Sequence, residues 1–280
     1  MKAVFTLKSA ESRRLLAKAV AKMPSVQKAY SDAYILLANG TTSAFIAQEL
    51  FGIDGINPER CTVGTSTSGV ICVTDPDKRD TFVNVFHKGV PKPDMTLNDA
   101  LNDFDINTVV IKGANAVDPD GNVGIITAGF DGGTVQRIIG TVTSTGLQLI
   151  SVVGLEKLVS SVREACRFVG ARRLDHSMGA DFGMYDISTS TVVTEIEAMN
   201  ILFGLRALHI ASGGVGGNGG AVVIAVEGDK EAVEEAVNFI ETQIKGEPAI
   251  PENKGNCETC RYFRCRYNGY KNGDLPFWLQ

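Results

Sequence analysis

Short apolar runs that end in glycine-rich turns and lead into helical segments constrain the fold of this chain more than any other feature of its sequence. The run Tyr34-Ile35-Leu36-Leu37 ends in Asn39-Gly40. It is followed by a helical pattern over residues 44–51, with Thr42 or Ser43 as the predicted N-cap. A second run, residues 108–111, leads to Gly113 in the same way. Alternation of this kind favours an α/β fold: an open, mainly parallel Rossmann-like sheet with helices on both faces.

Further elements are predicted from hydrophobic periodicity along the chain. Helices are expected over residues 9–22, 156–168, 195–205 and 229–244. Strands are expected over residues 69–73, 81–86, 148–153, 185–193 and 221–226. The glycine run 213–220 precedes a strand rather than opening a helix, so it is interpreted as a loop that can close over a ligand, not as a dinucleotide fingerprint.

Three regions are predicted from this pattern. Residues 1–174 form the α/β domain, residues 175–248 a small α+β unit of ferredoxin-like kind, and residues 249–280 a cysteine-containing tail without periodicity. Because the second unit is small and apolar, self-association into a homo-oligomer, a dimer, is expected.

Composition excludes several classes of protein. The 280 residues carry a formal net charge of -5, which argues against nucleic-acid binding through a basic surface. No apolar run approaches the roughly 20 residues that span a bilayer. The first residues are too polar for a signal peptide, so no membrane partner and a cytoplasmic location are expected.

The turn Gly40-Thr41-Thr42-Ser43 is the first candidate ligand site. Glycine lets a ligand approach the backbone closely, and the free N–H groups of the following helix favour a phosphate or carboxylate. The three hydroxyl groups can add hydrogen bonds. The alternative is that Gly40 only makes the turn and that a hydroxyl only caps the helix.

The second candidate site covers residues 111–133. It contains Gly113, Ala114, Gly132 and Gly133 as predicted ligand-binding positions. Lys112 can neutralise a phosphate or stabilise an oxyanion, and Asn115 can donate a hydrogen bond to one. Asp131 is the carboxylate best placed for proton transfer or ribose binding. Each of the three also has a plain structural interpretation, as a strand-end lysine, an Asx-turn or a loop aspartate.

The segments Ile111–Gly133 and Leu149–Val159 resemble the lactate-utilisation (LUD) domain family. More broadly, with Gly40-Thr41-Thr42-Ser43, the chain is similar to the ribose-5-phosphate isomerase and CoA transferase-like superfamily. The resemblance implies a Rossmann-like sheet with its site at the carboxyl ends of the strands, for a phosphorylated sugar or CoA ester. The isomerases of this superfamily place carboxylates where Lys112 and Asn115 stand here. Because these two residues cannot act as general bases in the same way, the case for an isomerase activity is weaker.

The tail contains the array Cys257-x2-Cys260-x4-Cys265. A C-x2-C turn presents two thiolates to zinc or to an iron–sulfur cluster. Another cysteine, a histidine, solvent or a partner would have to supply a fourth ligand. Free thiols and a disulfide stay open as alternatives. Similar cysteine clusters occur in the LUD family, so the resemblance implies a metal site here.

Cys61, Cys72 and Cys166 lie in apolar stretches and are expected in the core. The three histidines show no H-x-x-x-H spacing.

The sequence leaves three functions open: a protein, enzymatic or not, that binds a small anionic metabolite; a redox accessory protein of LUD type; and a metabolite sensor without catalysis.

Overall fold

A computed structural model describes residues 1–80, 82–130 and 132–280. Its strands are β1 (Lys2–Leu7), β2 (Tyr34–Leu37), β3 (Gly64–Thr67), β4 (Val70–Val73), β5 (Val85–His87), β6 (Val90–Pro91), β7 (Val109–Gly113), β8 (Ala116–Val117), β9 (Val123–Thr127), β10 (Gln148–Val152), β11 (Gly183–Ile187), β12 (Thr191–Val193), β13 (Arg206–Ser212) and β14 (Val222–Glu227). Its α-helices are α1 (Ser9–Lys22), α2 (Pro24–Asp32), α3 (Thr41–Phe51), α4 (Leu97–Asn102), α5 (Gly133–Thr145), α6 (Val162–Phe168), α7 (Glu195–Phe203) and α8 (Lys230–Phe239).

The main sheet has the order β12-β10-β7-β2-β5-β6. Its pairs from β12 to β2 are parallel, and β5 and β6 add antiparallel edges. In register, Ile111 of β7 lies between Ile150 of β10 and Leu37 of β2. The predicted α/β class with a mainly parallel sheet is confirmed.

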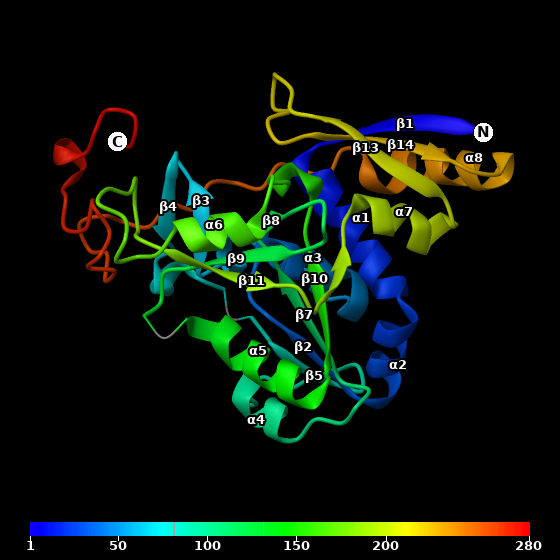
Figure 1. The fold of residues 1–280 in the computed structure, drawn as a ribbon, viewed down its shortest axis with the longest axis horizontal. Coiled ribbons are helices and arrows are strands. Elements are labelled where there is room, and N and C mark those ends of the chain that lie inside the picture. The colour runs from blue at the N-terminus through cyan, green and yellow to red at the C-terminus, as the bar shows by residue number, and fades with distance from the viewer. Residues whose placement is uncertain (81, 131) are drawn as a thin grey trace.

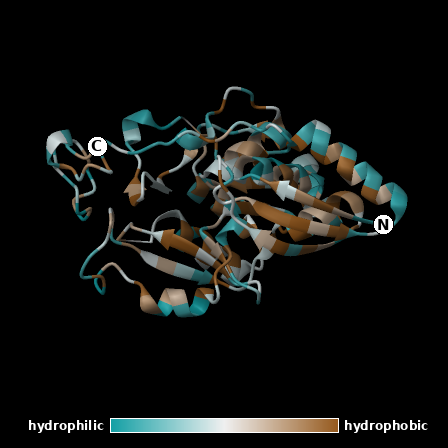
Figure 2. Ribbon diagram, turned by 90° about the horizontal axis from the view of Figure 1, so that it is seen from above, coloured by the Kyte–Doolittle hydropathy of each residue, from teal (hydrophilic) through white to brown (hydrophobic). Residues whose placement is uncertain are grey.

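Helices cover both faces of this sheet. Figure 1 shows α1 and α2 on one side of the strands and α4 and α5 on the other. Strand β2 is buried at every position, as expected for a strand covered on both faces. Figure 2 shows the same distribution: apolar colour follows the strands, and the outer faces of the helices are polar.

A smaller antiparallel sheet has the order β1-β14-β13 and packs against α7 and α8. Strand β1 comes from the N-terminus, and Phe5 pairs with Ile224. Strand β12, by contrast, joins the main sheet beside β10. The expected boundary at residue 174 therefore does not coincide with a boundary between the two sheets.

Several predicted elements are revised. The helix expected over residues 156–168 is a 3-10 turn, η3 (Leu155–Lys157), followed by extended chain and α6. The extended stretch is held because Val159 N donates to Val117 O (2.8 Å) and Val162 N donates to the buried carboxylate of Asp118 (2.9 Å). Specific hydrogen bonds thus prevail over a helical hydrophobic pattern.

The strand expected over residues 185–193 is two strands in different sheets, because β11 pairs with β9 whereas β12 pairs with β10. Of the strand expected over residues 81–86, Thr81 lies outside the described residues, and pairing begins at Val85. The N-cap of α3 is Gly40, so Thr42 and Ser43 stand inside the first turn rather than capping it.

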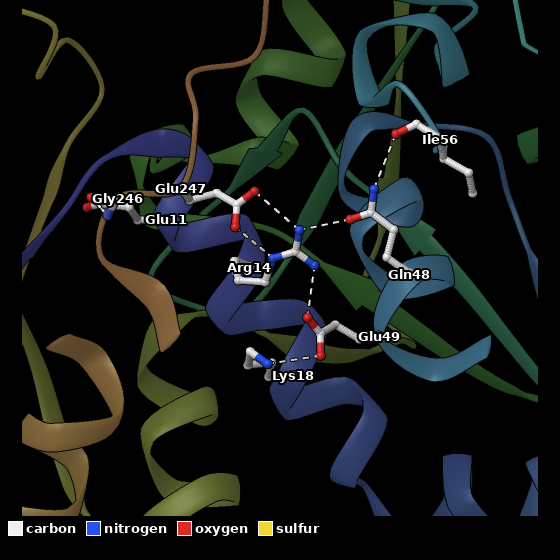
Figure 3. A network of polar contacts seen from close by, with 8 residues as sticks. All are labelled: Glu11, Arg14, Lys18, Gln48, Glu49, Ile56, Gly246 and Glu247. Carbon is white, nitrogen blue, oxygen red and sulfur yellow. Dashed lines mark hydrogen bonds and ion pairs between the residues drawn. The ribbon is translucent and has the colours of Figure 1, made fainter. Parts of the chain in front are cut away.

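Polar contacts connect α1 to α3 and to the segment that follows α8. Figure 3 shows the guanidinium group of Arg14 between Glu247, Gln48 and Glu49. Its nitrogens lie 2.8 Å from a carboxylate oxygen of each glutamate. Burial tends to lower the pKa of Arg14, but the two glutamates prevail and raise it. Arg14 therefore holds three separate segments around one charge.

The C-terminal segment, residues 249–280, contains little regular structure beyond the 3-10 turn η5 (Asn272–Asp274). It lies beside the hairpin of β3 and β4, as Figure 1 shows. No helix in the described parts of the chain is long and apolar enough to cross a membrane.

Candidate functional site

The candidate site lies where the parallel strands of the main sheet end. Strand β2 leads into α3, β7 into Ala114, β10 into η3, and β12 into α7. Because these strands are parallel neighbours, their carboxyl ends share one edge of the sheet. Arg14 contacts Phe45, and Lys18 contacts Glu49 one turn further on, so α1 and α3 run in the same direction and both begin near this edge.

The first turn of α3 carries unpaired polar groups. Within the part of the chain that the structure describes, the backbone N–H groups of Thr41, Thr42 and Ser43 have no acceptor, and no side chain caps the helix. The Ser43 hydroxyl is fully buried and also has no partner. Free amides at a helix N-terminus favour an anion.

Gly113 lies against this turn, as the sequence predicts. A methyl group added to Gly113 would lie 4.0 Å from Cβ of Thr42 and 3.9 Å from the carbonyl oxygen of Val152. The ends of β2, β7 and β10 therefore meet here, and the backbone of Gly113 is open to close approach.

Lys112 belongs to the other face of the sheet. Successive side chains of a strand point to opposite faces, so Lys112 points away from the face on which Gly113 meets Thr42. Its neighbour in register is Ser151, whose buried hydroxyl has no partner. Lys112 has no hydrogen bond or ion pair with any described residue, and burial lowers its pKa from 10.5 to about 8.

Lys157 places a cation at the residue that follows Gly113. Its ammonium group donates to the carbonyl oxygen of Ala114 over 2.9 Å. Burial, together with the charge of Arg13, lowers its pKa to about 8, although Glu156 and Glu195 oppose this. The sequence analysis quoted Lys157 only as part of the LUD-like segment. The signal that selected Lys112, a lysine adjacent to a glycine at a strand end, does not extend to Lys157, which follows Gly154 by three residues and lies in η3.

Glu195 is a buried carboxylate at the same edge. It accepts hydrogen bonds from the Ser12 hydroxyl and from Leu155 N, the latter over 2.9 Å. Burial raises its pKa, and these hydrogen bonds oppose the increase. Gly154 provides the room, since a methyl group there would lie 3.0 Å from Glu195 Oε1. Lysines with lowered pKa beside carboxylates with raised pKa are typical of functional sites.

The glycine run between β13 and β14 also reaches this edge. A methyl group on Gly220 would lie 2.9 Å from Oε2 of Glu156, whose Oε1 is paired with Arg13 at 2.9 Å. The run precedes β14, in agreement with its interpretation as a loop.

The remaining predicted residues lie on the side of β9 and α5. Gly132 is the N-cap of α5 and packs against the ring of Tyr185, and Gly133 is the first residue of that helix. Asn115 is exposed, and its side-chain oxygen accepts from Ile126 N over 3.0 Å. Asp131 lies outside the described residues. Of the predicted glycines, Gly113 thus lies against the first turn of α3, whereas Gly132 packs against Tyr185 of β11.

A separate hollow of about 340 Å³ lies between the later turns of α1 and α3 and is lined by residues such as Lys22, Tyr30 and Phe239. It is remote from the strand ends. Its lining residues on α1 and α3 come after Arg14 and Phe45, further from the helix N-termini that lie near those strand ends.

All six cysteines are free thiols. Cys61 is buried, and burial raises its pKa to about 12. Cys72 and Cys166 are only half-buried, which revises the expectation that they are core residues. With side chains as oriented, no group of three or more His, Cys, Asp or Glu side chains in the described ranges is arranged to hold a metal ion.

Comparison with known proteins yields no match: no family model, no curated protein and no solved structure corresponds to this chain.

Proposed function

We propose that the chain binds a small anionic metabolite at the carboxyl ends of β2, β7 and β10. The observation that carries the proposal is Lys157. Its ammonium group has three donors, of which Ala114 O takes one, and no carboxylate in the described chain forms an ion pair with it. Ala114 follows Gly113, which meets the first turn of α3, and a cation near free helix amides is complementary to a phosphate or carboxylate.

Phosphate esters, such as a phosphorylated sugar or a CoA ester, are the ligand class proposed. Gly113 lies next to Thr42, so a phosphate held by the α3 amides would lie close to the backbone of Gly113, where no side chain intervenes. The resemblance to the LUD and isomerase-like proteins supports the same class. A cytoplasmic location belongs to this proposal.

Catalysis, if the bound metabolite reacts, would use Lys157. With a pKa of about 8, its amino group exchanges a proton close to neutral pH and can serve as an acid or base. The carboxylate of Glu195 is committed to Ser12 and Leu155, so it is assigned to positioning.

Self-association is proposed to use the outer face of the small sheet. Val4, Leu208 and Ile210 are all more than half exposed there, and Val4 and Leu208 flank Ala225 on adjacent strands. Light scattering after gel filtration tests this: a dimer that L208K converts to a monomer supports the proposal, and a monomeric wild-type protein refutes it.

Ligand-dependent thermal melting tests the anion site. Inorganic phosphate, ribose 5-phosphate and coenzyme A are added separately to the wild-type protein and to K157M. At ten times Kd a ligand stabilises by about 1.4 kcal/mol, or roughly 3 °C for a chain of this size. At least one of the three should shift the wild-type Tm, and K157M should lose that shift.

The matched control is K28M, which removes an exposed lysine from α2. It should keep the full shift. That result would exclude a general loss of positive charge as the cause of the K157M effect. If no probe shifts the wild-type Tm, or if K157M responds like K28M, the proposed site is wrong.

A further inference from the structure

The C-terminal segment reaches the hairpin of β3 and β4 through one cysteine of that hairpin. Gly255 N donates to Sγ of Cys72 over 3.3 Å, and a methyl group on Gly255 would lie 2.8 Å from the carbonyl oxygen of Val73. Cys72 is separated from the tail cysteines by about two thirds of the chain, yet it lies beside them. The four residues that meet here, called the four-thiol cluster below, are Cys72, Cys257, Cys260 and Cys265.

The thiols of this cluster lie within electrostatic reach of one another. Burial raises the pKa of Cys72, and Cys257 and Cys260 raise it further. Burial also raises the pKa of Cys265, again with a contribution from each of the other three thiols. The cluster therefore supplies the four sulfur ligands that a tetrahedral site requires.

Backbone donors already point at the sulfur atoms. Besides the bond from Gly255, Tyr262 N donates to Sγ of Cys260 over 3.4 Å, and a backbone N–H of Tyr267 reaches Cys265. The N–H of Gly255 and the charge of Lys254 lower the pKa of Cys72, and the N–H of Tyr267 lowers that of Cys265, so these groups oppose part of the increase caused by burial.

The segment has only a small apolar core of its own. It contains no strand or α-helix in the described structure, and its fully buried apolar residues Tyr267, Leu275 and Leu279 form a small cluster with Val70. Scattered hydrogen bonds, such as those from the Tyr262 hydroxyl to Ala128 O and from Arg266 N to Gly179 O, join it to the rest of the chain. A segment with so small a core commonly depends on a disulfide or a metal for stability, and the cysteines here are free.

We propose that the four-thiol cluster binds one structural zinc ion, which fastens the C-terminal segment to the hairpin of β3 and β4. As oriented, the thiols do not converge on a common point, so binding requires rotation of the half-buried side chains about their Cα–Cβ bonds. Each thiol loses its proton when it becomes a ligand. Zinc has no redox chemistry, so this site anchors a segment rather than carrying electrons.

Metal analysis of the purified full-length protein, after exhaustive dialysis, tests the proposal. The wild-type protein should hold about one zinc per chain, and C72S should retain much less than half of it. C166S is the matched control, because it removes a half-buried thiol outside the cluster, and it should keep the full equivalent. Metal-free wild-type protein, or C72S with a full equivalent, would overturn the proposal.

Two further measurements keep the test decisive if C72S folds poorly. Removing zinc from the wild-type protein with a chelator should lower Tm and make residues 249–280 sensitive to protease, and added Zn²⁺ should reverse both effects. No change on chelation refutes a structural role. Iron with a visible sulfur-to-iron absorption band, in place of zinc, refutes the assignment to zinc.

Discussion

Replacing Lys112 by methionine is expected to stabilise the folded protein at neutral pH. Methionine has nearly the same length but no charge. Burial without an ion-pair partner lowers the pKa of Lys112 from 10.5 to about 8, which means that folding disfavours the charged form. Since one pKa unit corresponds to about 1.36 kcal/mol, the full penalty is roughly 3 kcal/mol. Lys112 is only partly shielded from water, so we expect about 1–2 kcal/mol.

The pH dependence follows from the direction of this change. The unfolded chain keeps the ordinary pKa, so between about pH 8 and 10.5 it binds more protons than the folded protein does. The penalty is therefore complete below about pH 8 and disappears as pH rises toward 10.5. The stability difference between K112M and wild type should be largest near pH 7 and shrink across this range.

Urea denaturation of both proteins at several pH values between 6.5 and about 10.5 measures this difference. The exposed-lysine variant K28M should match wild type within about 0.5 kcal/mol at each pH. Destabilisation of K112M at pH 7 would show that the ammonium group makes a favourable contact in the folded protein, and the reasoning from burial would fail.

Three other substitutions test separate parts of the structure. G113A adds a methyl group that meets only ordinary contacts, so urea denaturation should show a stability within about 1 kcal/mol of wild type, whereas thermal melting should show a weaker response to phosphate esters. R14A leaves the half-buried Glu247 without its cation and Glu49 with Lys18 alone, and we expect a loss of about 2–4 kcal/mol in urea denaturation; a loss below 0.5 kcal/mol would contradict this. E195A leaves the Ser12 hydroxyl and Leu155 N without an acceptor, for an expected loss of about 2–3 kcal/mol by the same measurement, whereas unchanged stability would show that water replaces the carboxylate.

Elements specified by nearby residues were predicted well. The helix over residues 9–22 has the predicted bounds, because its apolar positions repeat at helical spacing and Pro24 follows its last residue closely. Strand β2 and helix α8 show equally local patterns. The segment 156–168 was predicted wrongly because its conformation depends on Asp118, about forty residues earlier, which binds Val162 N.

Contacts between distant segments could not be predicted from one sequence. Strand β1 pairs with β14 although more than two hundred residues separate them. In the same way, Glu195 meets Ser12 and Cys72 meets the C-terminal segment only after the chain has folded. Periodicity and spacing report only neighbours along the chain. The fold class could therefore be predicted, but not which residues meet at the carboxyl ends of the parallel strands.

The alternation of side chains along β7 changes how the candidate site is understood. In the sequence, Lys112 and Gly113 are adjacent and suggest one site. In the strand they belong to opposite faces, so Gly113 meets Thr42 while Lys112 has Ser151 as its neighbour in register. The charge near Gly113 then comes from Lys157 of η3, which donates to the carbonyl oxygen of Ala114, the next residue after Gly113. Comparing K157M with K112M in the phosphate-ester melts therefore separates the two faces, because only the lysine on the binding face should change the response.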